Sequence, residues 1–324
     1  MVVSPSFHPP WWARGPHAQT LGARFLRPKG RVPLKRERWH TPDGDFVDLD
    51  FVDIEGLRED CLVLLLHGLE GSARSGYAYQ IYEQLSRRGF QTVGLNFRSC
   101  SGELNRGLRL YHSGETEDPR WVLGRLKERF PNKRLAAVGI SLGGNVLLKY
   151  LGESGEQSGL DLAAAWSVPF DLSAGADFME KGFAQVYVTR LLRSLKAKVR
   201  IRTVELEPLI DLERTMISRT FWEFDDAATA PLHGFDGAAD YYGRSSSAGF
   251  LGAIRVPTLV IHSADDPFLP AEAIPGNALE ANPILTPLIT ERGGHVGFIT
   301  GANPLKPVFW AENTIADWLA ERLG

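Results

Sequence analysis

The sequence predicts an α/β fold in which a mostly parallel sheet is covered by helices on both faces. Short apolar segments alternate with longer amphipathic ones along most of the 324 residues, which is the pattern of successive strands and helices. The segment at 61–66, Cys-Leu-Val-Leu-Leu-Leu, has no polar side chain and therefore predicts a strand buried on both faces. A hydrophobic fraction of 44% is enough for a large core.

A hairpin is expected first, because residues 38–41 and 46–52 alternate apolar and polar around a Pro-Asp-Gly turn. Further strands are expected at 61–66, 91–96, 134–139, 162–166, 258–262 and 285–290. Helices are expected at 76–88, at 115–130, directly after Ser141, and at 308–323. The first three helices would each connect two parallel strands, as the geometry of a parallel sheet requires, and the fourth would close the chain.

The alternation stops after Pro169 and resumes near residue 258. We therefore expect a core formed by residues 35–169 and 245–324, interrupted by a helical cap insertion at 170–244 (the insertion). Residues 1–34 (the arm) are rich in proline and in tryptophan and phenylalanine. Proline breaks regular structure and exposed aromatics need burial, so the arm is expected to be irregular and packed on the core.

Charge and targeting signals exclude several classes of protein. A net charge of −3 offers no bulk attraction for nucleic acid. The N-terminus lacks the pattern of a signal peptide, and the longest apolar run, 61–66, is too short to span a bilayer. Two cysteines, Cys61 and Cys100, cannot form a disulfide framework, which favours a cytoplasmic location. Peripheral contact with a membrane stays open.

One basic stretch, at 190–202, allows two interpretations. Its charges are spaced among leucines and a valine, which favours the solvated face of a helix. The alternative is a contact with anionic lipid or substrate.

Residues 139–143 read Gly-Ile-Ser-Leu-Gly and match the Gly-x-Ser-x-Gly pattern. The pattern follows an apolar strand and precedes a helical segment, which is the setting of a nucleophile elbow in the α/β-hydrolase fold. The flanking glycines relieve crowding around a strained serine. Ser141 is therefore the candidate nucleophile.

A serine hydroxyl needs a general base to become a nucleophile at neutral pH. Of eight histidines, only His295 lies on a loop after the last expected strand, where this fold carries its base. The orienting carboxylate should lie between serine and histidine in sequence. Asp265 and Asp266 are both candidates, and the Asp-x-x-x-Pro form that ends at Pro270 favours Asp266. Asp171 is an outside alternative.

The oxyanion of a tetrahedral intermediate needs two backbone N–H donors. We expect one from Leu142, directly after the nucleophile, and one from Leu69, in the His-Gly turn that follows the strand at 61–66. His67 is then a structural residue of that turn. No metal ion or organic cofactor is required by this chemistry.

Beyond these residues the chain resembles the YheT-like branch of the α/β-hydrolases. The matching segments spread over nearly the whole chain, at 9–12, 16–20, 96–103, 111–118 and 224–235. The resemblance implies a Ser–Asp–His triad on Ser141, Asp266 and His295, and hydrolysis of carboxylic esters. It implies a small-molecule ester or lipid substrate, from short-chain esters to acylglycerols and phospholipids.

Other interpretations of the same residues remain. The protein could be a ligand-binding or receptor-like homologue with slow or no turnover, or it could cleave amides or thioesters, because one triad serves all acyl transfers. Arg98, His112 and Glu115 could position loops near the site, although a structural role is favoured. In the insertion, the apolar side chains could line an acyl pocket, although ordinary packing is favoured; they are Phe178, Met179, Phe183, Val186 and Tyr187.

Overall fold

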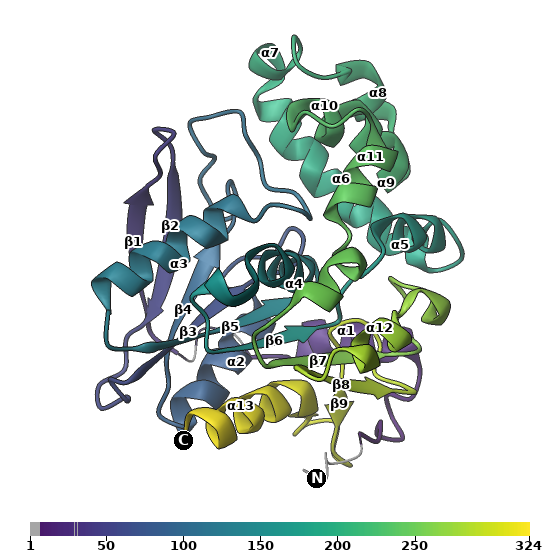
Figure 1. Ribbon diagram of the computed structural model, residues 1–324. Helices are drawn as coiled ribbons and strands as arrows, with labels where there is room; N and C mark the ends of the chain where they lie inside the picture. The colour runs from purple at the N-terminus through teal and green to yellow at the C-terminus, as the bar shows by residue number, and fades with distance from the viewer. Residues whose placement is uncertain (1–6, 29, 31) are drawn as a thin grey trace.

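The computed structural model describes residues 7–28, 30 and 32–324, and its centre is an eight-stranded sheet (Figure 1). The strands are β1 (Leu34–His40), β2 (Phe46–Val52), β3 (Cys61–Leu66), β4 (Gln91–Asn96), β5 (Arg134–Ile140), β6 (Leu162–Trp166), β7 (Thr258–Ser263) and β8 (Leu285–Thr290). Their order in the sheet is β1-β2-β4-β3-β5-β6-β7-β8. β2 pairs antiparallel with β1 and β4, and the other neighbours pair parallel. The predicted hairpin and all six predicted later strands are confirmed.

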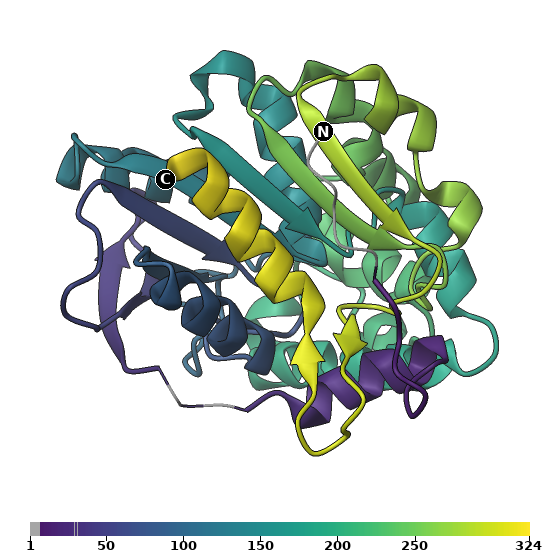
Figure 2. The same ribbon diagram turned by 90° about the horizontal axis from the view of Figure 1, so that it is seen from below.

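Helices cover both faces of the sheet. Those outside the insertion are α1 (Pro16–Leu26), α2 (Gly76–Arg87), α3 (Glu117–Arg129), α4 (Leu142–Ser154), α12 (Gly276–Ala281) and α13 (Trp310–Leu323). α2 and α13 pack side by side on one face, as Figure 2 shows, and α3, α4 and α12 pack on the other.

The position of β3 between two helical layers explains why its sequence has no polar side chain. Leu62, Leu64 and Leu66 point into the core under α3 and α4, whereas Cys61, Val63 and Leu65 point into the core under α2 and α13. Successive side chains of a strand face opposite sides, so a strand between two helical layers must be apolar throughout. Burying each leucine contributes roughly 1.5–3 kcal/mol.

Between β6 and β7 the chain forms helices and no strand. They are α5 (Leu172–Met179), α6 (Ala184–Ile201), α7 (Thr203–Leu206), α8 (Leu212–Ile217), α9 (Phe221–Phe224), α10 (Ala230–Leu232) and α11 (Ala238–Ser245). Figure 1 shows them as a separate green group above the sheet. The group has an apolar core of its own, which includes Met179, Leu192 and Phe224. Leu21 of α1 packs against that core, so the arm contacts the insertion.

The arm differs from the prediction, because residues 16–26 form a regular helix, α1. Pro16 lies in the first turn, where backbone N–H groups have no acceptor within the helix, so the missing N–H of a proline costs no hydrogen bond. The arm's prolines therefore lie beside or at the start of the helix and do not break it. Residues 1–6, 29 and 31, which include Pro5, lie outside the described residues.

The closing helix also differs, since it begins at Trp310 and not at residue 308. Val308 and Phe309 form β10 (Val308–Phe309), which pairs antiparallel with β9 (Ile299–Thr300). This two-stranded ribbon lies against α1. Over the described part of the chain, no helix is both long and apolar enough to cross a bilayer.

Candidate active site

Ser141 lies on the sharp turn between β5 and α4. Its φ of 54° is in the left-handed region, and its N–H donates to the Trp166 carbonyl at 2.8 Å. A Cβ on Gly139 would come within 2.4 Å of the Gly143 carbonyl oxygen, and a Cβ on Gly143 within 2.3 Å of the Leu66 carbonyl oxygen. Both positions therefore need glycine because backbone approaches backbone. The strained turn lifts the serine hydroxyl out of the sheet edge.

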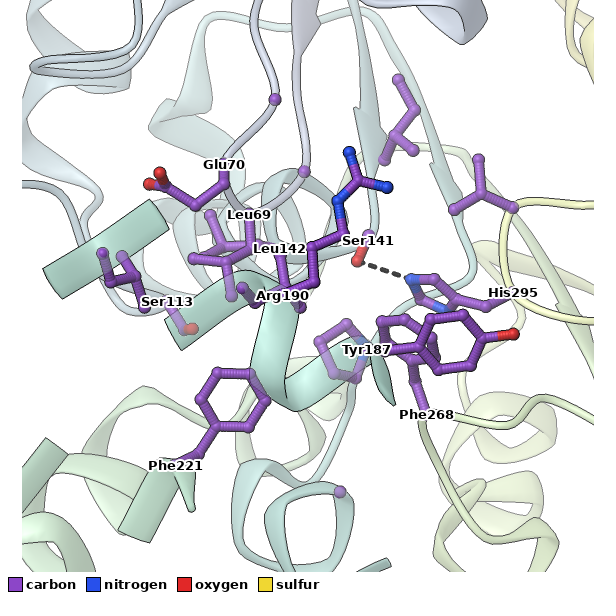
Figure 3. A pocket seen from close by; sticks show the side chains of 18 of the residues that line it. Leu69, Glu70, Ser113, Ser141, Leu142, Tyr187, Arg190, Phe221, Phe268 and His295 are labelled. Carbon is purple, nitrogen blue, oxygen red and sulfur yellow. Dashed lines mark hydrogen bonds between the residues drawn. The ribbon is translucent and has the colours of Figure 1, made fainter. Parts of the chain in front are cut away.

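The structure brings three predicted side chains into one hydrogen-bonded chain. Ser141 Oγ lies 2.8 Å from His295 Nε2 (Figure 3). His295 Nδ1 lies 2.8 and 3.1 Å from the two carboxylate oxygens of Asp266. Asp266 is only 2% exposed, and one of its oxygens also accepts from the Phe268 N–H at 2.8 Å. The Phe268 ring stacks on the imidazole with centroids 3.9 Å apart. These contacts fix the position and orientation of the imidazole.

The two other candidate carboxylates, Asp265 and Asp171, accept hydrogen bonds from backbone N–H groups. Asp265 Oδ1 accepts from the Gly294 N–H at 2.8 Å, so this residue holds the loop that carries His295. Burial raises the pKa of Asp265. Asp171 caps the first turn of α5 by accepting from the Ala174 N–H at 3.0 Å. Neither carboxylate contacts the imidazole.

The turn after β3 is held by two tyrosine hydroxyls, one on each side of Leu69. Tyr77 accepts from the Gly68 N–H at 3.0 Å, and Tyr111 accepts from the Glu70 N–H at 2.7 Å. Gly68 approaches the nucleophile closely, because a Cβ on it would lie 3.2 Å from the Cβ of Ser141. The neighbouring N–H groups thus have partners, and the Leu69 N–H stays the candidate oxyanion donor of this turn.

Leu142 is the first residue of α4, and its N–H has no acceptor within the helix. The helix dipole adds partial positive charge at the same place. Leu69 and Leu142 both line the pocket that contains Ser141 and His295. Figure 3 shows both leucines beside the serine.

His67 is fully buried and lies beside this turn. Its Nε2 accepts from the Phe97 N–H at 3.1 Å, so its Nδ1 carries the proton and donates to the Gly68 carbonyl at 2.8 Å. Burial lowers the pKa of His67 to about 4. His67 is therefore a neutral residue that shapes the turn, as predicted.

The loop that carries His295 is held by residues that the sequence did not single out. Thr20 of α1 accepts from the His295 N–H at 2.9 Å. Arg27, directly after α1, donates to the carbonyls of Val296 and Gly297 at 2.8 and 3.1 Å and pairs with buried Glu312 at 2.6 Å. Thr20 ends the segment 16–20 that resembles the YheT-like branch, but no local pattern predicts these contacts, because their partners lie at the far end of the chain.

A second unforeseen contact joins the insertion to the turn after β3. Lys198 of α6 forms an ion pair with Glu70 at 2.6 Å, and both side chains are largely buried. Ser194 and Tyr111 also donate to the Glu70 carboxylate. Helix α6 is thus tied to the residue that follows Leu69.

The pocket has a volume of about 600 Å³ and lies between the sheet edge and the insertion. Of the apolar residues considered above, Met179 and Tyr187 line it. Phe178, Phe183 and Val186 are 36%, 48% and 55% exposed, so they neither line the pocket nor pack in a core. The pocket wall also takes the apolar side chains of Leu172 in α5, Phe221 in α9 and Tyr241 in α11.

Arg98, His112 and Glu115 are linked through shared partners: His112 Nε2 lies 3.9 Å from a Glu115 carboxylate oxygen, and Glu115 also accepts from the N–H of Asp118 at 3.2 Å. Arg98 pairs with Asp118 at 2.7 Å, and Glu115 pairs with Arg109 at 2.6 Å, away from the pocket lining. His112 alone of the three lines the pocket. The favoured structural role thus fits Arg98 and Glu115. Among the residues that the structure describes, no group of His, Cys, Asp and Glu could hold a metal ion.

Comparison with known proteins agrees with this architecture. The family model described as alpha/beta hydrolase fold matches residues 62–302. The Escherichia coli protein YheT, whose name assigns it provisionally to the esterases, is 42% identical over 311 residues, or 95% of this chain and 91% of YheT. Human phospholipase ABHD3 is 30% identical over 95% of this chain and 77% of its own. The esterase Pf2001 of Pyrococcus furiosus shares the fold, with a TM-score of 0.60 at 18% identity over 100% of this chain and 98% of that one. The chain belongs to the α/β-hydrolase fold family, in the branch that includes YheT.

Proposed function

We propose that this protein is a serine hydrolase that cleaves carboxylic esters through an acyl-enzyme on Ser141. The observation that carries the proposal is the chain of contacts from Ser141 Oγ through His295 to Asp266 at hydrogen-bond distances, at the wall of a 600 Å³ pocket. A nucleophile, its base and an orienting acid in this order are the requirements of acyl transfer.

In the first half of the reaction, His295 Nε2 takes the hydroxyl proton as Ser141 Oγ attacks the ester carbonyl. The carbonyl oxygen becomes an oxyanion, which accepts from the N–H groups of Leu69 and Leu142. Asp266 stabilises the imidazolium and keeps the Nδ1 proton in place. His295 then gives its Nε2 proton to the alcohol oxygen, and the alcohol leaves.

In the second half, water attacks the acyl-enzyme while His295 removes one of its protons. The same N–H pair binds the second oxyanion, and the acid leaves as Ser141 recovers its proton. The pocket volume is that of a site for a small organic molecule, and its apolar wall suits an acyl chain. The names of relatives, an esterase and a phospholipase, support short-chain or lipid-like esters as substrates. We also propose that the insertion acts as a cap over this pocket.

The test combines Ser141→Ala with a matched serine control. Ser86 of α2 is suitable, because its hydroxyl has no partner among the described residues and lies outside the pocket lining. We expect Ser141→Ala to lose fluorophosphonate labelling and at least about a thousandfold in hydrolysis of p-nitrophenyl butyrate, and Ser86→Ala to keep both. Wild-type turnover in Ser141→Ala would overturn the proposal. Absence of labelling and turnover in the wild type would favour a ligand-binding protein.

A further inference from the structure

The active-site pocket contains an unbalanced positive charge. Four arginines line it, namely Arg24, Arg27, Arg74 and Arg190. Arg27 and Arg74 are each paired with a buried carboxylate within 2.8 Å. For Arg24 and Arg190, the described part of the chain offers no carboxylate within ion-pair distance.

These two arginines come from separate parts of the sequence, and both line the pocket. Arg24 belongs to the last turn of α1, and Arg190 belongs to α6 of the insertion. Figure 3 shows the Arg190 side chain reaching from α6 toward Ser141. The pKa of Arg24 is lowered, first by its partial burial and then by the positive charge of Arg190. Both residues are exposed to solvent as well as pocket-lining, and two like-charged guanidinium groups at one pocket favour an anion between them.

The acidic residues of the pocket do not neutralise this pair. Glu70 is bound to Lys198. Asp225 accepts from the hydroxyls of Thr229 and Tyr242 at 2.5 and 2.7 Å. Both carboxylates are therefore satisfied by other groups.

Away from the arginines, the pocket wall is apolar. Met179, Leu172 and Phe221 line it, and Phe221 lies on the side of Ser141 away from His295 in Figure 3. The pocket that contains the nucleophile is therefore lined by both charged and apolar side chains.

We propose that Arg24 and Arg190 form a subsite for an anionic group, a phosphate or a carboxylate, on the ester substrate. This inference rests on the proposed function and narrows it to amphiphilic esters. The acyl chain lies along the apolar wall, the ester carbonyl meets Ser141, and the anion on the alcohol part binds the two guanidinium groups. Guanidinium groups bind both phosphates and carboxylates through paired N–H donors.

A kinetic experiment compares three esters with one acyl chain: octanoylglycerol, octanoylglycerol phosphate and octanoylglyceric acid. We expect the wild type to prefer at least one anionic ester, and the preferred one identifies the anion as phosphate or carboxylate. Arg24→Gln and Arg190→Gln should each lower kcat/KM for that ester about tenfold, the scale of one charge-assisted hydrogen bond. The neutral ester should change less than about twofold. The matched control is Arg193→Gln, an exposed arginine of α6 that does not line the pocket.

Two kinetic results would overturn the subsite: equal kcat/KM for neutral and anionic esters in the wild type, or equal losses for all three esters in the arginine variants. A binding experiment separates this failure from failure of the proposed function. Calorimetry on Ser141→Ala with octylglycerol and octylglycerol phosphate, which are ethers, needs no turnover. The subsite is supported, even if no ester is cleaved, when octylglycerol phosphate binds more tightly than octylglycerol. Arg190→Gln should abolish this preference, and Arg193→Gln should keep it. Equal binding of the two ethers, together with equal binding of octylglyceric acid, rejects it.

Discussion

Replacing Arg27 with methionine removes the positive half of a buried ion pair and leaves Glu312 in the protein interior. The two side chains are 2% and 0% exposed, and their contact is 2.6 Å long. The other Glu312 oxygen, Oε2, has no partner among the described residues. Removing one partner of such a pair costs about 3–5 kcal/mol. At about 2 °C per kcal/mol for a chain of this size, we expect Tm to fall by about 6–10 °C.

The loss should depend on pH in a definite direction. Burial raises the pKa of Glu312 even with Arg27 present, and removing the arginine raises that pKa further. A carboxyl whose folded pKa exceeds its unfolded pKa favours folding at low pH, and this contribution is lost as pH rises through the folded pKa. The difference in unfolding free energy between wild type and Arg27→Met should therefore be smaller at pH 5 than at pH 8.

The double variant Arg27→Met with Glu312→Leu separates stability from activity. Replacing both charges with apolar side chains should recover most of the unfolding free energy. It should not recover turnover fully, because Arg27 also binds the carbonyls of residues 296–297, directly after His295. Urea unfolding followed by circular dichroism, and hydrolysis of p-nitrophenyl butyrate, measure the two effects. A loss under 1 kcal/mol at pH 8, or the same loss at both pH values, would refute the reasoning.

Three further substitutions test the contacts around the site, each with p-nitrophenyl butyrate as substrate. Asp266→Asn should lower kcat about a thousandfold or more, whereas Asp265→Asn should stay within about tenfold because an amide oxygen can still accept from the loop N–H; equal effects would contradict the assignment. Lys198→Met should lower kcat about tenfold with little change in KM, since it frees Glu70 beside the Leu69 donor, and Lys198→Arg should restore it. Thr20→Val should lower kcat about tenfold by loosening the histidine loop, Thr20→Ser should rescue it, and an unchanged kcat in Thr20→Val would count against a role for the arm.

Features set by local sequence were predictable. The strand β3 is apolar throughout because it lies between two helical layers, and its bounds agree with those expected from the run alone. The nucleophile turn was recognisable because close backbone contacts require its glycines. The bounds of a buried strand coincide with the bounds of the apolar run, because burial determines which residues must be apolar.

Features set by long-range contacts were not predictable. Arg27 and Glu312 are 285 positions apart, and neither differs locally from a surface residue. The proline content of the arm does not predict helix α1, because proline breaks most helices, although Pro16 occupies the first turn, which tolerates it. The solvated helix face predicted for the basic stretch fits Arg190, which is exposed, but its place in the pocket lining depends on the fold and was not predictable.

The contact between Thr20 and His295 also has a consequence for synthesis of the protein. The two residues are separated by 275 positions, so α1 leaves the ribosome long before the loop that it holds. At about 5–20 residues per second, the helix waits roughly 15–55 s for its partner. The growing chain therefore lacks a completed Ser141 site until residue 295 has left the ribosome.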